Sequence, residues 1–191
     1  MQTLALHPFS SSAQDESPPL NVCIAYEDFE TGKRAMKTYN YLVEHLGHEC
    51  HFANQMWKFD VLSVPKLREM AVKDAAAAQI VIVAGQGNNP LPIQVKAWIE
   101  SWMSQAGHAV ALVGLFEDLS EFSESPARDY LASVARRGDM EFFCQTAKSD
   151  GGKRKTKGDP QRNEIAISAL ASVIQEQDEH DIAVSRWGIN E

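Results

Sequence analysis

Short apolar runs, separated by longer stretches of mixed polarity, divide the chain. Four of the runs are nearly continuous, at 22–26, 80–84, 109–114 and 140–144. Runs of this kind are typical of strands that are buried on both faces, as in a parallel sheet. A fifth segment, 48–57, alternates more between apolar and polar residues, which favours a strand nearer to a sheet edge.

The stretches between these strands carry apolar residues at intervals of three and four, the spacing of a helix with one buried face. In the first stretch, Ala35, Tyr39 and Leu42 form such a stripe, and Gly47 is in the usual position to end the helix. Further helices are predicted to begin near proline residues, since proline is favoured in the first turn. These starts are Pro65, Pro92 and Pro126, and a last helix is predicted over 161–182.

Five strands that alternate with five helices predict an α/β fold, a three-layer, doubly wound, parallel five-stranded sheet. Right-handed crossovers leave few ways to wind such a sheet, and the order 2-1-3-4-5 is favoured. Residues 1–20 are rich in Ser and Pro and are expected to form a disordered N-terminal arm. Residues 21–191 are expected to form a single domain that includes a C-terminal helix and tail.

The charge balance excludes some classes of partner. The chain has 191 residues with 18 Lys and Arg against 26 Asp and Glu, a net charge of −8. Such an acidic chain argues against general nucleic-acid binding and against attraction to anionic membranes. The three cysteines, Cys23, Cys50 and Cys144, lie far apart in apolar or strand-like runs, which favours reduced thiols. With no leader pattern and no membrane-length apolar run, we expect a cytoplasmic protein.

The predicted sheet indicates where a functional site would lie. In an open parallel sheet, ligands bind beyond the carboxyl ends of the strands, where the strand order reverses. Here that point lies between the first and third strands. The loops expected to meet there are 27–33 and 85–89, with 115–118 beside them.

These loops resemble those of flavodoxins. The Thr31-Gly32 pair is similar to part of the flavodoxin first loop, and 84–92 resembles the glycine-rich loop that precedes Leu-Pro and an apolar helix. The segment 111–118 is similar to the fourth strand that ends beside the flavin. The resemblance implies a flavodoxin-like fold and an FMN site made of Thr31, Gly32, Lys33, Gly85, Gln86, Gly87, Asn88, Asn89, Phe116 and Asp118.

Acidic residues depart from the flavodoxin pattern. Glu27, Asp28 and Glu30 would put negative charge where the flavin phosphate binds, and Coulomb repulsion disfavours that arrangement. Glu27 and Asp28 instead resemble the acidic pair of response-regulator receiver domains, which implies a Mg²⁺ site. Receiver domains carry a phosphoacceptor aspartate after the third strand, but Gly85 and Gln86 follow that strand here. We therefore do not expect phosphotransfer.

The remaining candidates favour structural roles. His45, His48 and His51 lack the spacing of a metal site, and Cys144 is expected in the core. No Walker, dinucleotide-binding or hydrolase motif occurs. The basic run 153–157 is expected to be a solvated loop. The tail 186–191 contains a tryptophan and is expected to fold back over the carboxyl edge of the sheet or onto a partner.

Three functions stay open at this point. The leading hypothesis is a non-catalytic, cytoplasmic binding or signalling module that takes a small-molecule ligand or a protein partner at the carboxyl edge. The second is an FMN-binding electron-transfer protein or reductase. The third is a receiver-like module without a phosphoacceptor. A homodimer is compatible with each, because Trp98 and Trp102 lie four residues apart and pack either in the core or between subunits.

Overall fold

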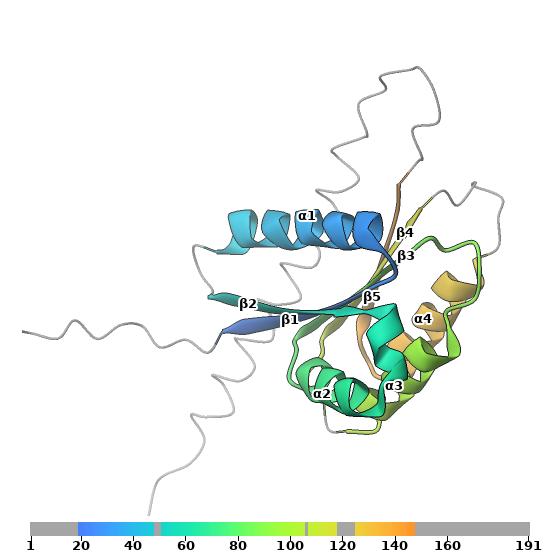
Figure 1. Ribbon diagram of the computed structural model, residues 1–191. Helices are drawn as coiled ribbons and strands as arrows, with labels where there is room; N and C mark the ends of the chain where they lie inside the picture. Colours follow the sequence, from blue (N-terminus) through green and yellow to red (C-terminus); the bar gives the residue numbers. More distant parts are fainter. Residues whose placement is uncertain (1–18, 48–50, 106, 118–124, 148–191) are drawn as a thin grey trace, which may run out of the picture.

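A computed structural model describes residues 19–47, 51–105, 107–117 and 125–147. In this part of the chain, five parallel strands form one sheet in the order β2-β1-β3-β4-β5 (Figure 1). The strands are β1 (Leu20–Tyr26), β2 (Phe52–Lys58), β3 (Ile80–Gly85), β4 (Ala111–Glu117) and β5 (Glu141–Ala147). The predicted fold class and strand order are confirmed.

Helices cover both faces of the sheet. They are α1 (Phe29–Leu46), α2 (Pro65–Ala76), α3 (Ile93–Met103) and α4 (Pro126–Arg137), with the short 3₁₀ helix η1 (Phe59–Ser63) between β2 and α2. Helix α1 lies on one face, and α2, α3 and α4 pack on the other (Figure 1). The helix predicted over 161–182 lies outside the described residues.

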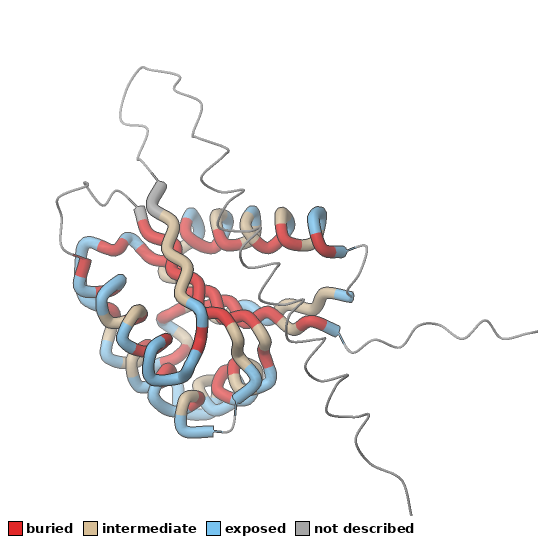
Figure 2. Tube along the Cα trace, turned by 180° about the vertical axis from the view of Figure 1, so that it is seen from behind, coloured by how far each residue is buried: buried red, intermediate tan, exposed pale blue. Residues whose placement is uncertain are grey.

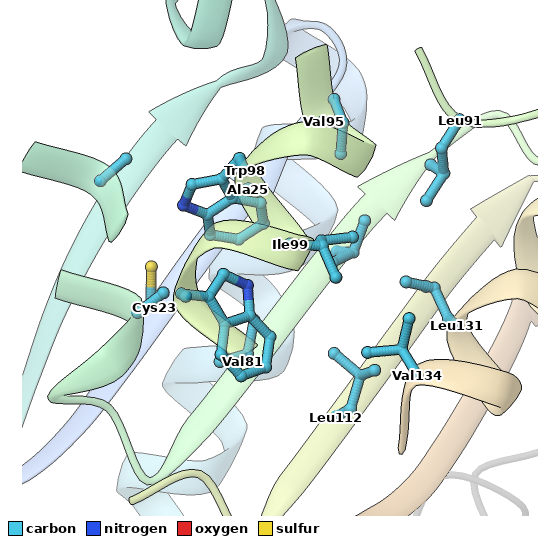
Figure 3. Packing of buried hydrophobic residues seen from close by; sticks show 14 of the residues in the cluster. Cys23, Ala25, Val81, Leu91, Val95, Trp98, Ile99, Leu112, Leu131 and Val134 are labelled. Atoms are coloured by element: carbon cyan, nitrogen blue, oxygen red, sulfur yellow. The ribbon is translucent and has the colours of Figure 1, made fainter. Parts of the chain in front are cut away.

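The two faces of the sheet bury two separate apolar clusters. Every residue of β3 is buried, as expected for the central strand of a parallel sheet. In Figure 2 the buried positions gather in the inner strands, whereas the edge strands β2 and β5 are mainly intermediate. On the face of α2, α3 and α4, the large side chains Trp98 and Trp102 belong to the buried cluster, and Figure 3 shows Trp98 among its neighbours. Both indoles belong to the core of this domain, which confirms the first of their two predicted placements. Cys144 packs against the same cluster, as predicted.

Two element boundaries differ from the prediction. Helix α1 begins at Phe29, within the stretch 27–33 that the sequence indicated as a loop. Strand β4 continues to Glu117, through most of the stretch 115–118 that was expected to be a loop. Both differences shorten the loops at the carboxyl edge, and they change which of the predicted site residues can be reached from solvent.

The start of the domain agrees with the expected arm to within one residue. β1 begins at Leu20, which is buried, and so the last residue of the expected 1–20 arm belongs to the sheet. Residues 1–18 lie outside the described part. Of the histidine cluster, His45 and His51 are exposed, whereas His48 and Cys50 lie outside the described residues. Within the described residues, none of the helices combines the length and the apolar character needed to cross a membrane.

Candidate functional site

The carboxyl ends of β1 and β3 form the centre of the predicted site. These two strands are neighbours in the sheet, but the chain leaves β1 into α1 on one face and leaves β3 toward α3 on the other. This is the reversal point at which open parallel sheets bind ligands. A main-chain hydrogen bond joins the two strand ends there, with Glu27 N donating to Ala84 O at 3.0 Å.

The Glu27 side chain crosses from β1 to the loop after β3. Its Oε2 accepts a hydrogen bond of 2.8 Å from the backbone N–H of Gln86. A side chain at Gly85 would bring its Cβ to 3.0 Å from this same oxygen, so the glycine leaves room for the carboxylate. The Glu27 carboxylate therefore binds the backbone N–H of Gln86 near the start of the 85–89 loop.

Asp28 caps α1. Its Oδ1 accepts a hydrogen bond of 2.9 Å from the backbone N–H of Thr31, and the Thr31 hydroxyl accepts one of 2.8 Å from the backbone N–H of Asp28. This reciprocal arrangement is a capping box, with threonine in the third helical position. The backbone hydrogen bond from Thr31 is the main cause that lowers the pKa of the Asp28 carboxyl below its ordinary value, and bonds from the Thr31 hydroxyl and Gln86 add to it. Asp28 is therefore a carboxylate at neutral pH.

Thr31 and Gly32, which the flavodoxin resemblance placed in a phosphate loop, lie inside the first turn of α1. Both residues are buried, and the Thr31 side chain is fully used by the capping box. A Cβ at Gly32 would lie 2.8 Å from the Tyr26 ring, so this glycine permits close packing of α1 on β1. The geometry gives both residues a structural role, because neither presents a free polar group to a ligand.

The loop after β3 combines exposed amides with one buried glycine. Gln86, Asn88 and Asn89 are exposed, and Gln86 Nε2 donates to Asp28 Oδ2 at 3.3 Å. Gly87 is buried and has a positive φ of 83°, a conformation that glycine adopts at little cost. Its carbonyl accepts a hydrogen bond of 3.0 Å from the hydroxyl of Ser125, the N-cap residue of α4. The loop is thus fastened to α4, and its amide side chains face solvent.

Phe116 is a core residue. The flavodoxin resemblance implied an aromatic group beside the flavin at this position, but Phe116 lies within β4 and is fully buried. Phe116 lies close to the backbone of Gly87 and Gly114, since a Cβ at either glycine would come within 3 Å of Phe116. The residue therefore presents no face to a ligand at the edge. Asp118 lies outside the described residues.

Arg34 belongs to this edge, although the sequence indicated only a charge at the start of the helix that could point to solvent. Its Nη2 donates to the backbone carbonyls of Gly85 and Leu115, at 3.1 Å each. The guanidinium thus joins α1 to the carboxyl ends of β3 and β4. Lys33, by contrast, is exposed and lies 3.9 Å from the Glu30 carboxylate. The only sequence signal for Arg34 is its place in the first two turns of the helix that follows β1.

Two large apolar side chains at the same edge were also missed. Phe29 and Ile93 are the first residues of α1 and α3, and they are 77% and 80% exposed. Both lie outside the buried stripe of their helix, so no periodic pattern identifies them. A search for apolar residues directly after a predicted helix N-cap would have found them.

The described residues do not fit the FMN phosphate. The backbone N–H groups of Gln86 and Thr31 already donate to the carboxylates of Glu27 and Asp28. A phosphate at either N–H would meet a carboxylate, and one pair of like charges 4 Å apart costs about 4 kcal/mol at an effective dielectric constant of about 20.

The Mg²⁺ site at Glu27 and Asp28 stays a prediction from the receiver-domain resemblance. Mg²⁺ binds near-octahedrally to oxygen, often with one or two carboxylates and several waters. The described part of the chain contains no group of three or more His, Cys, Asp or Glu side chains that could hold a metal ion. The two carboxylates also accept hydrogen bonds from backbone and amide N–H groups.

Comparison with solved structures identifies the class of fold. The chain has a flavodoxin-like fold, with five parallel strands in the order 2-1-3-4-5. It matches the Streptococcus pneumoniae TIGR4 flavodoxin with a TM-score of 0.50 and 17% identity, over 80% of this chain and 98% of that chain. It also matches the rubredoxin oxygen:oxidoreductase of Desulfovibrio gigas, with a TM-score of 0.50 and 15% identity, over 82% of this chain and 37% of that one.

Comparisons of sequence add no closer relationship. No protein-family model matches the chain, and no curated protein matches it. At identities of 15% and 17%, the structural matches establish the fold and not the site, because one fold carries many unrelated functions. Function has to be argued from the residues at the carboxyl edge.

Proposed function

We propose that the protein is a non-catalytic, cytoplasmic binding or signalling module that takes its ligand or partner at the carboxyl edge of the sheet. The observation that carries this proposal is the use of Glu27 and Asp28. Their carboxylates accept from the backbone N–H groups of Gln86 and Thr31, which are the groups that would otherwise hold an anion there.

The same observation favours this function over an FMN-dependent one. In a flavodoxin-like site, the flavin needs a phosphate cradle at the start of the first helix and an open face for its ring. Here Thr31 and Gly32 are buried within α1, and Phe116 is buried within β4. A reductase or electron carrier would have to hold its cofactor by other means.

The edge instead offers hydrogen-bond acceptors with negative charge. The Glu27 and Asp28 carboxylates accept hydrogen bonds from uncharged donors: backbone N–H groups, the Thr31 hydroxyl and the Gln86 amide. Lys58 also interacts with Asp28 through space, although the Asp60 carboxylate is the main cause that raises the pKa of Lys58. A ligand that brings an ammonium or guanidinium group would gain charge-assisted hydrogen bonds to the two carboxylates. Gln86, Asn88 and Asn89 add exposed amides beside them.

The test compares a cationic and an anionic probe on the full chain. Spermidine, FMN and inorganic phosphate are each titrated into isotope-labelled protein, and amide chemical shifts are followed. Spermidine is expected to move the amides of 27–30 and 85–89. FMN is expected to leave the melting temperature unchanged and to leave no flavin absorbance after desalting, since a ligand that binds the native state stabilises it.

A pair of charge-neutralising variants supplies the control. Glu27→Gln should weaken the spermidine response. Glu44→Gln makes the same change in the last turn of α1, about 24 Å along the helix from Asp28, and should leave the response intact. Saturable FMN binding with a rise in melting temperature would overturn the proposal. So would spermidine shifts that are equal in both variants.

A further inference from the structure

We propose that the occupant of the carboxyl edge is a segment of another protein in which an arginine or lysine lies between two apolar side chains. This inference rests on the proposed function and names the class of partner. It starts from Phe29 and Ile93, whose exposed fractions of 77% and 80% exceed those of the other exposed large apolar residues in the described part of the chain, Met70, Val64 and Met56.

The positions of these two side chains set them apart from ordinary exposed apolar residues. Single apolar side chains on a surface are common and need no explanation. Phe29 and Ile93, however, begin the two helices that leave the reversal point, one on each face of the sheet. An aromatic ring gains a large apolar contact area when it is covered, so Phe29 is suited to anchor a partner.

The distance between the two anchors favours a protein partner over a small molecule. Helices α1 and α3 lie on opposite faces with the sheet between them (Figure 1). Helix diameters and layer spacing put the axes of two such helices roughly 20 Å apart. An extended peptide spans that distance with about six residues, at 3.3–3.6 Å per residue. A partner that touches both anchors therefore crosses the whole edge.

The charge between the anchors selects the chemistry of the partner. Glu27 and Asp28 lie where the chain turns from β1 into α1, directly before Phe29, and Glu27 bonds to Gln86 in the loop that leads to Ile93. A cationic side chain in the middle of the segment would meet these carboxylates, and a guanidinium fits a carboxylate with two parallel hydrogen bonds.

The same charge disfavours a second copy of this chain on this edge. In a twofold symmetric contact, each surface patch meets itself. The Glu27 and Asp28 carboxylates of both copies would then lie in one interface, and like charges in a shared site repel. The net charge of −8 adds to this repulsion at long range.

The experiment uses fluorescently labelled synthetic peptides and measures their affinity for the full chain by anisotropy. The test peptide has two leucines about six residues apart with two arginines between them, in a background of serine and glycine. Three matched peptides replace the arginines with glutamates, replace the leucines with serines, or place the leucines next to each other. We expect binding of the first peptide and at least about a tenfold loss for each of the others, which corresponds to about 1.4 kcal/mol.

Variants of the protein locate the contact. Combined Phe29→Ser and Ile93→Ser should weaken the test peptide by at least about tenfold, as truncation of interface anchors does. Met70→Ser is the control, because Met70 is 50% exposed on α2 and takes no part in the edge. Since all three side chains are exposed, the melting temperatures should stay close to that of the wild type.

The outcomes separate this inference from the proposed function. Equal binding of the glutamate peptide, or no effect of the double variant, would overturn the assignment of the partner, and spermidine shifts at the edge would still support the function. If the peptide and spermidine both fail, both proposals fall. A variant with glutamine in place of Lys153, Arg154, Lys155 and Lys157 tests the chain's own basic run as the occupant. A tenfold gain in peptide affinity, about 1.4 kcal/mol, would overturn the assignment to another protein.

Discussion

Replacement of Gly87 by alanine tests whether this glycine belongs to the fold or to a ligand site. Gly87 has a φ of 83°, and the left-handed region costs a residue with a side chain about 1–2 kcal/mol. A Cβ there would also lie 2.8 Å from Cβ and 3.1 Å from Cγ of Phe116. Because Phe116 is fully buried within β4, its ring cannot move aside freely, and overpacking of a core costs about 1–3 kcal/mol.

The two contributions add to about 2–5 kcal/mol, a large part of the 5–15 kcal/mol that is typical for a domain. Urea unfolding of the full chain should therefore show a clear fall in the transition midpoint for Gly87→Ala. Gly107→Ala is the matched control. Gly107 is exposed, and the nearest neighbour of an added Cβ would be the Ala76 carbonyl oxygen at 3.7 Å, so a change within about 0.5 kcal/mol is expected.

A double variant tests whether the clash with Phe116 contributes to the destabilisation by Gly87→Ala. If the clash with the ring contributes, Gly87→Ala combined with Phe116→Leu should be less destabilised than the sum of the two single variants, since the residues share one contact. Equal midpoints for Gly87→Ala and Gly107→Ala would refute the reasoning. Strictly additive effects would refute the part assigned to the clash with Phe116.

Three further predictions concern single side chains. Asp28→Asn keeps an N-cap acceptor but cannot titrate. Because the folded-state pKa of Asp28 is lowered, any stability advantage of the wild type should be present above about pH 4 and should vanish as the pH falls through that folded-state pKa. A pH-independent difference in urea unfolding would contradict this prediction. Trp102→Phe removes a buried indole N–H that has no hydrogen-bond partner among the described residues. The desolvation penalty of that group, about 1–3 kcal/mol, is then no longer incurred and should offset much of the lost packing energy. A loss of stability above about 3 kcal/mol would argue that the indole N–H has a hydrogen-bond partner in the folded protein. Arg137→Ala breaks the 2.6 Å ion pair with Glu100 on the surface of α3 and α4. Thermal unfolding should show a salt-dependent loss of stability of no more than about 1 kcal/mol. A larger loss that does not depend on salt would contradict a surface role for this ion pair.

The sheet was predictable because its signal is local. Nearly continuous apolar runs at 22–26 and 80–84 indicate strands buried on both faces, and the helical stripes between the runs require parallel connections. The structure adds the register, in which Val22 lies beside Ile80. The expected place of the site, at the reversal point, followed from the predicted order of the strands.

The first turn of α1 was not predictable by the same reasoning. The apolar stripe that indicates the helix begins at Ala35, so the preceding residues have the polarity of a loop. The helix nevertheless begins at Phe29, because Asp28 and Thr31 cap each other and the Tyr26 ring packs where Gly32 has no side chain. The capping box can be recognised in the sequence as a pattern, whereas the packing of Gly32 against the Tyr26 ring cannot.

The layers and the strand order followed from the sequence, since they depend on the periodicity of apolar residues along the chain, and they indicate the edge where we propose that a partner binds. The composition of that edge depends on contacts that form when the chain folds. Arg34 reaches carbonyls 51 and 81 residues away, and Glu27 takes a backbone N–H 59 residues away. Contacts of this kind exist only after β1, β3 and β4 have come together, because nothing in the local sequence brings these groups within hydrogen-bond distance of one another.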